Sequence, residues 1–211
     1  MTRELIVNVV LFRLNEERLQ VLLAAQTDEN PQGISPAIPA ETPNDVESLE
    51  DTANRLITNL IDRRETYLEQ LFTYGERDQP ARIVYFALVT SGARLIAGGA
   101  ARWIPATGQP VLSPAEAEVL SYALRRLRYK LEYSAVGFQL LPGEFTLSEL
   151  QHTYEIILGE KLDKRNFRRR MLQSGIIEET QRQRLGEGRP ARLYRYRPDA
   201  VAEVKARRLF P

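Results

Sequence analysis

The chain has 211 residues, 43% of them apolar, which suffices for one large domain or two modest domains with cores of their own. It contains no cysteine and one histidine, which excludes a disulfide framework, thiolate chemistry and a histidine metal cluster. Residues 1–110 hold 10 basic and 15 acidic residues, a net charge of −5, whereas residues 111–211 hold 19 basic and 13 acidic residues, a net charge of +6. Only the C-terminal half is therefore suited to binding a polyanion.

The N-terminal half alternates apolar, β-branched runs with polar turns. Its first residues lack the layout of a signal peptide, and no 18 consecutive residues are apolar, so we expect a cytoplasmic protein. Runs at residues 5–12 and 19–25 flank a polar turn at 15–18 and predict a β-hairpin. A polar, proline-bearing loop is expected at residues 26–44.

A helix is predicted next, at residues 48–61, where apolar side chains recur at helical spacing. Glu50 and Asp51 stand in its first turn, where the helix dipole favours anions. Further strands are expected at residues 71–74, 83–89 and 102–104. The first domain is therefore predicted to have a mixed α/β fold.

Residues 38–60 resemble a Nudix box, the loop–helix motif G-x5-E-x7-R-E-U-x-E-E-x-G-U in which U is a bulky apolar residue. Glu47 and Arg55 match the first glutamate and the arginine at the right spacing. The other positions differ: the glycines are replaced by Glu41 and Asp62, and the later glutamates by Leu56, Asn59 and Leu60.

In Nudix hydrolases these helix carboxylates collect Mg²⁺, a hard ion that needs several oxygen ligands to bridge substrate phosphates. Two leucines and one amide cannot supply them. We therefore expect no metal site, no catalytic residue and no cofactor. Glu47 and Arg55 are interpreted as a structural ion pair that braces the loop against the helix.

A helix between the two halves is predicted from the stretch Ser113-Pro114-Ala115-Glu116, a capping box with proline at the first helical position. Four leucines follow at intervals of 4, 3 and 4 residues: Leu120, Leu124, Leu127 and Leu131. This spacing fits a dimerisation or interdomain helix that transmits a signal, and it fits an ordinary core helix equally well. One and a half heptads are too few to identify a coiled coil.

The next segment predicts the first helix of a helix–turn–helix. Thr146 and Glu149 form a capping box and Phe145 and Leu150 a hydrophobic staple, so a helix should begin at Leu147. Gly159 should end it. The expected buried stripe is Leu147, Leu150, Tyr154, Ile157 and Leu158, and His152 on the opposite side is interpreted as a surface residue.

A basic stretch, residues 161–197, follows with 12 Lys/Arg against 4 Asp/Glu. Asp163 can cap a helix that runs to Gln173, with Ser174-Gly175 as its end. At 100° per residue, Phe167, Met171 and Leu172 fall on one side and the cations and amides on the other. Strands at 176–182 and 191–197 around a basic turn complete a predicted winged helix–turn–helix.

The cations and amides of this stretch are the predicted DNA contacts. Arginine suits guanine, asparagine or glutamine suits adenine, and arginine or lysine also neutralises phosphate. Arg165, Asn166 and Arg169 are expected at base edges. The full predicted set is Lys164, Arg165, Asn166, Arg168, Arg169, Arg170, Gln173, Arg189 and Arg192. The alternatives are a winged helix for RNA or protein contacts, or a merely solvated charge run.

Five segments together resemble the Nudix-related transcriptional regulators, the NrtR family: residues 67–75, 127–134, 145–151, 162–169 and 188–191. The resemblance covers nearly the full length and is specific. It implies an α+β chain with an N-terminal Nudix-like α/β/α sandwich and mixed sheet (residues 1–110). A linker or dimerisation helix (111–142) and a C-terminal winged helix–turn–helix (143–211) are expected to follow.

The resemblance further implies a ligand-responsive bacterial regulator, a repressor of NAD-metabolism or sugar-use genes, that binds double-stranded operator DNA as a homodimer. Its effector would be ADP-ribose, a related nucleotide or a phosphorylated sugar, bound by the non-catalytic Nudix-like domain. Arg82 and Tyr85 are the candidate contacts for phosphate and for base or ribose. The alternative function is a Nudix-type pyrophosphate hydrolase with an accessory interaction domain.

Overall fold

The computed structural model describes residues 4–15, 17–27, 34–62, 66–75, 79–90, 92–98, 101–108, 112–185 and 190–200. The chain divides into two compact units, Met1–Leu124 and Arg125–Pro211, which are taken separately. None of the described helices is both long and apolar enough to cross a membrane.

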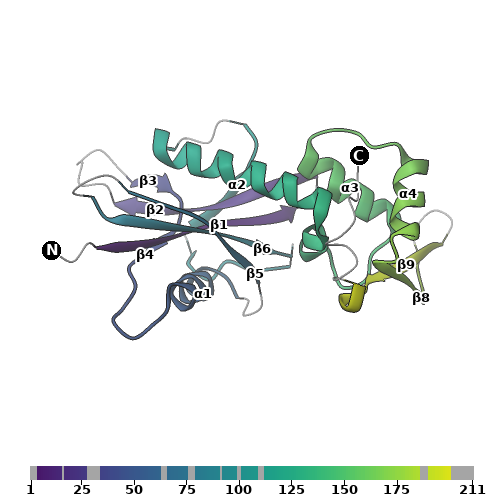
Figure 1. Cartoon of the computed structure of the whole chain (residues 1–211), viewed down its shortest axis with the longest axis horizontal. Helices are drawn as coiled ribbons and strands as arrows, with labels where there is room; N and C mark the ends of the chain where they lie inside the picture. The colour runs from purple at the N-terminus through teal and green to yellow at the C-terminus, as the bar shows by residue number, and fades with distance from the viewer. Residues whose placement is uncertain are drawn as a thin grey trace. The chain divides into compact units, whose positions relative to one another are not determined.

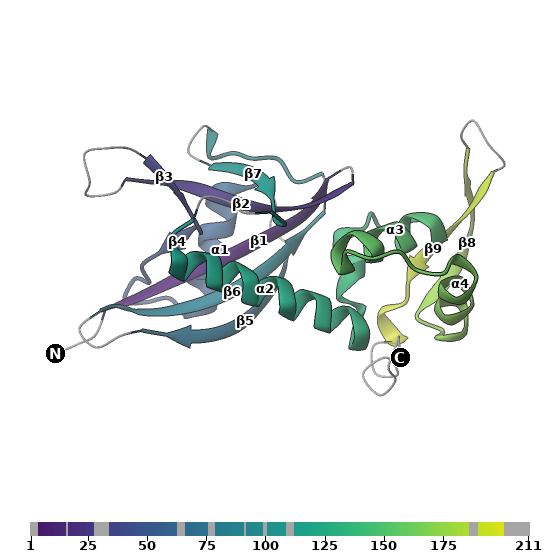
Figure 2. The same cartoon turned by 90° about the horizontal axis from the view of Figure 1, so that it is seen from above.

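The first unit is built on a mixed β-sheet. β1 (Leu5–Asn15) and β2 (Arg18–Thr27) form the predicted hairpin, and β1 also pairs in parallel with β6 (Ala81–Val89). The edge strand β5 (Tyr67–Tyr74) is antiparallel to β6, and β7 (Ala101–Pro105) is antiparallel to β2. The strand order is β3-β2-β1-β6-β5, with β4 on β1 and β7 on β2 (Figure 2).

Two short strands lie where a continuous loop was predicted. β3 (Ile34–Ala37) pairs with β2, and β4 (Ala40–Glu41) pairs with β1. β3 contains Pro36, which cannot donate to a ladder and is tolerated only at a sheet edge. The prediction of an uninterrupted loop over residues 26–44 is therefore wrong here, because a neighbouring strand rather than local propensity creates these pairings.

Helices cover both faces of this sheet. α1 (Leu49–Leu60) begins at Ser48, which forms a capping box with Asp51, and its apolar face packs against alternate residues of β1 and β6. The first turns of α2 (Pro114–Tyr133) lie on the opposite face (Figure 1). Because side chains alternate along a strand, Val7 and Val9 face α1 while Asn8 faces α2. The predicted α/β/α sandwich is confirmed.

Three of the four leucines of the α2 stripe are buried within the chain, and the fourth, Leu124, is partly buried. Leu120, Leu127 and Leu131 are at most 3% exposed, which supports the core-helix alternative at these positions rather than a seam between two chains. Tyr122 and Tyr129, on the other side of the helix, are 39% and 55% exposed. The boundary between the two units falls inside α2, after Leu124.

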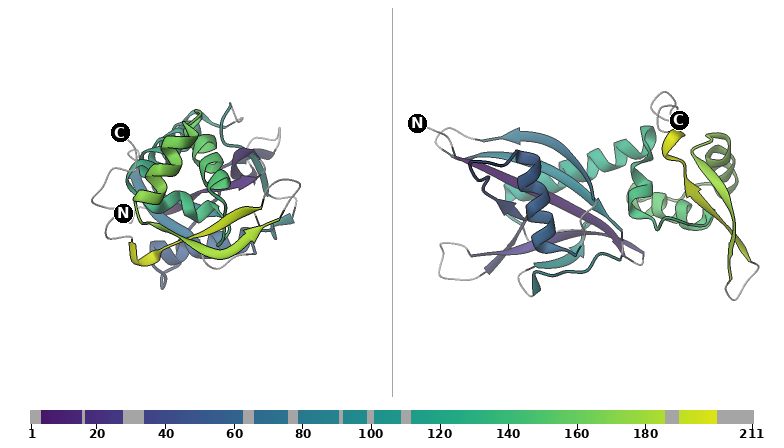
Figure 3. Two further views of the ribbon diagram at one scale, coloured as in Figure 1. Left: turned by 90° about the vertical axis from the view of Figure 1, so that its right-hand side faces the viewer. Right: turned by 90° about the horizontal axis from the view of Figure 1, so that it is seen from below.

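The second unit is a winged helix–turn–helix, as predicted. A 3₁₀ helix (Ala135–Leu140) precedes α3 (Leu147–Leu158) and α4 (Lys164–Gln173). The antiparallel strands β8 (Ile177–Arg184) and β9 (Ala191–Tyr196) form the wing (Figure 3), followed by a 3₁₀ turn, Pro198–Ala200.

Local signals set the limits of α3. The side chain of Thr146 accepts from the Glu149 N–H and the side chain of Glu149 accepts from the Thr146 N–H, which is the predicted capping box. Gly159 closes the helix at φ +79°, in the left-handed region that favours glycine. Leu150, Tyr154 and Ile157 are buried, whereas the remaining members of the predicted stripe, Leu147 and Leu158, and also His152, are only partly buried.

Candidate nucleic-acid interface and effector pocket

α4 is fixed by its cap and by two buried side chains. The Asp163 carboxylate accepts from the Asn166 N–H at 2.7 Å, which starts the helix. Phe167 and Met171 are 2% and 1% exposed, and the Phe167 ring packs edge-on against Tyr154 at 5.5 Å between centroids. Leu172, predicted on the same side, is instead 51% exposed. That prediction is wrong because Leu172 projects about 100° from Met171, beyond a narrow buried stripe.

The remaining side chains of α4 form a cationic face. Lys164, Arg165, Arg169 and Gln173 are exposed, while Asn166, Arg168 and Arg170 are partly buried. Arg169 Nη2 donates to Asn166 Oδ1 at 2.9 Å, which places an arginine and an amide side by side. The helix contains no carboxylate, and among the described residues none of its five cations forms an ion pair.

The cations of the wing are arranged differently. Arg192 Nη1 lies 2.9 Å from Glu179 Oε2 across the hairpin. Arg182 and Arg184, which sequence reasoning did not select, reach Glu144 and Glu149 beside the start of α3. The predicted contact Arg189 lies outside the described residues. Of the described cations on α4 and the wing, those without an ion pair therefore lie on α4, as binding to a polyanion requires.

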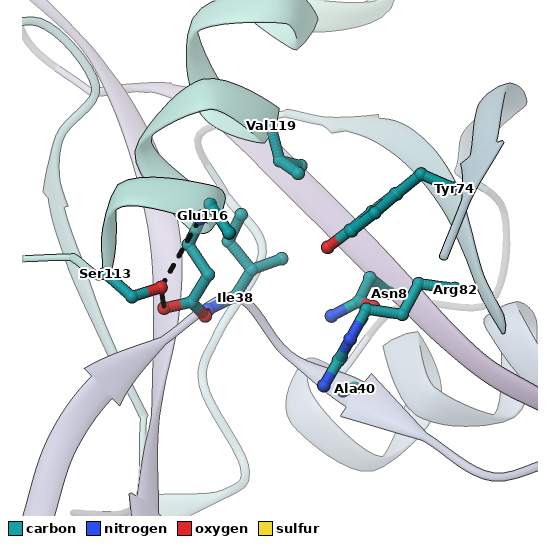
Figure 4. A pocket seen from close by; sticks show the side chains of 9 residues that line it. Asn8, Ile38, Ala40, Tyr74, Arg82, Ser113, Glu116 and Val119 are labelled. Atoms are coloured by element: carbon teal, nitrogen blue, oxygen red, sulfur yellow. Dashed lines mark hydrogen bonds between the residues drawn. The ribbon is translucent and has the colours of Figure 1, made fainter. Parts of the chain in front are cut away.

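A pocket in the first unit lies between the sheet and the start of α2 (Figure 4). Its volume is about 200 Å³, and its polar lining comes from three strands and α2. Arg82 Nη1 donates to Oδ1 of Asn8, which is only 5% exposed, at 3.2 Å. The labelled lining residues are Asn8, Ile38, Ala40, Tyr74, Arg82, Ser113, Glu116 and Val119.

Glu116 anchors the α2 side of this pocket. Its Oε1 accepts from the Ile38 N–H at 2.9 Å, and its Oε2 accepts from Ser113 Oγ at 2.8 Å. The second contact joins Ser113 and Glu116, the two residues from which the start of this helix was predicted. Burial raises the pKa of Tyr74; the Arg82 cation opposes this shift and the Glu116 anion adds to it. Cation, phenol, amide and carboxylate thus converge on one small cavity.

The two predicted effector contacts do not lie together. Arg82 lines the pocket beside α2, but Tyr85 belongs to the core cluster on the α1 face, 6% exposed, with its hydroxyl 3.4 Å from Gln70 Oε1. Burial raises the pKa of Tyr85, and the Glu50 anion adds to this. Residues an odd number apart on one strand face opposite sides. Asn8 was missed, although a polar residue inside an apolar strand was a signal for it.

The segment that resembles a Nudix box holds the expected ion pair. Arg55 Nη2 lies 2.6 Å from Glu47 Oε1, and Arg55 Nε lies 3.1 Å from Glu47 Oε2. Leu56 and Leu60 are buried in the core, and Asn59 is exposed. In the part of the chain that the structure describes, no three His, Cys, Asp or Glu side chains are grouped to hold a metal ion.

Residues 137–196 match the family model of the NrtR DNA-binding winged helix domain. The chain is 34% identical over 203 residues to the ADPR responsive transcriptional repressor NtrR of Acinetobacter baylyi, and the match covers 90% of this chain and 80% of that protein. The chain belongs to the NrtR family. The resemblance inferred from the sequence is confirmed.

Two solved structures have the same fold. The crystal structure of Shewanella oneidensis NrtR complexed with a 27mer DNA matches with a TM-score of 0.83 at 30% identity, over 94% of this chain and 95% of that one. A MutT/nudix family protein from Enterococcus faecalis matches with a TM-score of 0.75 at 24% identity, over 93% and 87%. A Nudix-like sandwich followed by a winged helix is thus the architecture of this NrtR-family chain.

Proposed function

We propose that this chain is a ligand-responsive transcriptional repressor that binds operator DNA through its winged helix. The observation that carries the proposal is the face of α4, where five cations, one asparagine and one glutamine occur without a carboxylate in an NrtR DNA-binding domain. The similarity to an ADPR responsive transcriptional repressor supports it. Expected targets are genes of NAD metabolism or sugar use.

Two kinds of contact are proposed for this face. Arg165, Asn166 and Arg169 stand where a helix in the major groove meets base edges, and their donors and acceptors fit guanine and adenine. The remaining contacts are proposed to hold the DNA backbone or the adjacent groove: Lys164, Arg168, Arg170, Gln173, Arg189 and Arg192. Backbone contacts orient the helix and carry no sequence information themselves.

The test compares wild type, Arg165→Ala and Arg18→Ala on a duplex site selected by the wild type from a random pool. Arg18 is an exposed cation of the first unit and is the matched control. Arg165→Ala should cost about 1–3 kcal/mol and relax the preference at one base pair, while Arg18→Ala should bind as wild type does. Wild-type affinity and preference in Arg165→Ala would refute the assignment of α4 as the reading helix.

The effector is proposed to bind in the pocket between the sheet and α2. Arg82 supplies a cation for a phosphate, Tyr74 an aromatic wall, and Glu116 oxygens that can accept from ribose hydroxyls. ADP-ribose, related nucleotides and phosphorylated sugars all carry phosphate and sugar hydroxyl groups that these side chains can bind. Tyr85, on the other face of the sheet, does not line this pocket.

We also propose that the Nudix-like domain is not catalytic. Leu56, Asn59 and Leu60 stand where hydrolases of this type carry metal-binding glutamates, and they cannot supply the oxygen ligands that Mg²⁺ needs. ADP-ribose and related pyrophosphates should therefore not be cleaved with Mg²⁺ or Mn²⁺. Turnover that rises with protein concentration and is lost in Glu47→Gln would refute this.

The active form is proposed to be a homodimer on an inverted-repeat operator. The exposed tyrosines of α2, Tyr122 and Tyr129, are the proposed site of self-association. Half-sites should be separated by roughly one helical turn or a multiple of it. Analytical ultracentrifugation of the free protein and footprinting of the complex would test this, and a monomer that protects a single half-site would contradict it.

A further inference from the structure

A second cavity, of about 270 Å³, opens in the winged helix between the start of α3, α4 and the start of β9. Two of its eight lining residues are cations and none is an anion. The lining is Thr146, Leu147, Ser148, Arg168, Pro190, Ala191, Arg192 and Tyr194. A pocket with this lining favours a ligand that brings negative charge.

Arg168 reaches this cavity from α4. Its Nη2 donates to Ser148 Oγ at 2.9 Å, so the guanidinium is turned toward α3 rather than outward with Arg165 and Arg169. Its Nε is buried and has no acceptor among the described atoms. A guanidinium offers five N–H donors, so this contact leaves most of them available to an acceptor in the cavity.

Arg192 supplies the second cation. It lies on β9, and its exposed side chain pairs with Glu179 on β8 at 2.9 Å through Nη1 alone. Glu149, at the start of α3, is paired with Arg184, and Glu179 is paired with Arg192. Arg168 therefore adds a positive charge that no described carboxylate at this cavity neutralises. The pairing also holds Arg192 beside the cavity, which lowers the entropy that its ordering by a ligand would cost.

The start of α3 adds backbone donors to the two cations. The capping box satisfies the N–H groups of Thr146 and Glu149. The intervening N–H groups, on Leu147 and Ser148, are in the first turn and have no partner within the helix. The positive end of the helix dipole lies at the same place, and phosphates bind at such sites.

We propose that this cavity holds one phosphate of the DNA backbone, bound by Arg168, Arg192 and the Ser148 hydroxyl and N–H. The inference rests on the proposed DNA-binding function and adds Ser148 and the start of α3 to the contact surface. A phosphate held here would connect α3, α4 and the wing to a single point on the DNA backbone. It would thereby fix the depth at which α4 enters the groove.

Ser148→Asp separates this role from a structural one. A carboxylate in the first turn of a helix favours folding, so the melting temperature should be unchanged or higher. The same carboxylate would repel a phosphate and occupy Arg168. Binding to random-sequence duplex should weaken by roughly tenfold or more, and the salt slope between about 50 and 200 mM should fall by about one.

Thr58→Asp, on the exposed side of α1, makes the same change in net charge and should bind as wild type does. Arg192→Gln is a second variant, in which an exposed side chain of the wing is altered, and it should lower the salt slope similarly.

Wild-type affinity and salt slope in Ser148→Asp would refute the proposal. The DNA assignment would also be wrong if inorganic phosphate stabilised only the wild type while both proteins bound duplex equally. A wild type that binds no duplex would instead refute the proposed function, and this inference with it.

Discussion

Arg55 holds together the segment that precedes α1. Besides its two contacts with Glu47, its Nη1 lies 3.3 Å from Glu41 Oε2 and its Nη2 donates to the Thr42 carbonyl at 3.1 Å. One planar guanidinium thus joins β4, the following loop and the helix, a role that its fixed fork of donors suits. In a chain without the later glutamates of the motif, the surviving pair therefore has a structural function.

The pH dependence of stability should show this pair. The Arg55 hydrogen bonds lower the pKa of Glu47 from its ordinary value of 4.5 to about 2. A carboxylate whose pKa is depressed by folding stabilises the native state fully above its unfolded pKa. That contribution is lost as the pH falls toward the pKa in the folded state.

In urea unfolding between pH 7 and pH 2.5, Glu47→Gln should be less stable than wild type at pH 7 and should lose less stability on acidification. Glu118→Gln, which removes an exposed carboxylate of α2, is the control. Parallel curves for wild type and Glu47→Gln would contradict this.

Gly137 illustrates a constraint that no local pattern reveals. A Cβ added there would lie 2.7 Å from Leu131 Cδ2 and 3.1 Å from Tyr154 Cε2, and both of those side chains are fully buried. Gly137→Ala should therefore cost about 1–3 kcal/mol, the usual effect of overpacking a core. At Gly143 a Cβ would meet nothing within 4 Å, and Gly143→Ala should be neutral or stabilise by about 0.4–1 kcal/mol. Chemical denaturation of both variants decides this, and equal stabilities would contradict it.

At the scale of the element, helix limits could be predicted from the sequence, because their causes lie within a few residues. Ser48, Thr146 and Asp163 each cap the helix that follows, as their positions indicated. β3 and β4 could not be predicted, because pairing with β2 and β1 depends on residues distant in the chain. The lining of the pocket beside α2 could be predicted only in part for the same reason. Arg82 was selected, but Asn8 and Tyr74 reach the pocket from other strands.

The exposure of Leu172 leads to a prediction about how α4 reads DNA. Its side chain projects within about 20° of Arg165 around the helix, so it belongs to the proposed groove face. An apolar side chain in the major groove can contact the methyl group of thymine. Replacing thymine by deoxyuracil at one position of the selected site should weaken wild-type binding by about 0.8 kcal/mol, the value for one buried methylene. Leu172→Ala should be insensitive to that replacement. Equal effects of uracil on both proteins at every position would contradict the contact.

At the scale of the whole chain, the two proposed functions lie in separate units of opposite charge. The sequence places the acidic excess in residues 1–110 and the basic excess in residues 111–211. α2 is the element common to both units: its first turns line the proposed effector pocket, and the unit boundary lies within it. The helix that would contact a ligand in this pocket therefore continues into the second unit, which contains the winged helix. Regulation requires that the ligand favour one conformational state of this pair of units.

The last prediction follows from that requirement. An effector that binds only the native fold should stabilise the protein by about 2.7 kcal/mol at 100 times its dissociation constant. If it also changes DNA affinity by some factor, DNA must change the effector's affinity by the same factor, because binding free energies are linked reciprocally. Calorimetric titration of ADP-ribose, NAD and phosphorylated sugars into free protein and into the DNA complex measures both factors. Arg82→Ala should lose ligand binding and keep its DNA affinity in the absence of ligand, because Arg82 lies in the first unit, in the effector pocket. A ligand that stabilises wild type and Arg82→Ala equally would place the effector site elsewhere. If the factor by which ligand changes DNA affinity differs from the factor by which DNA changes ligand affinity, a third equilibrium, such as self-association, is coupled to both binding steps.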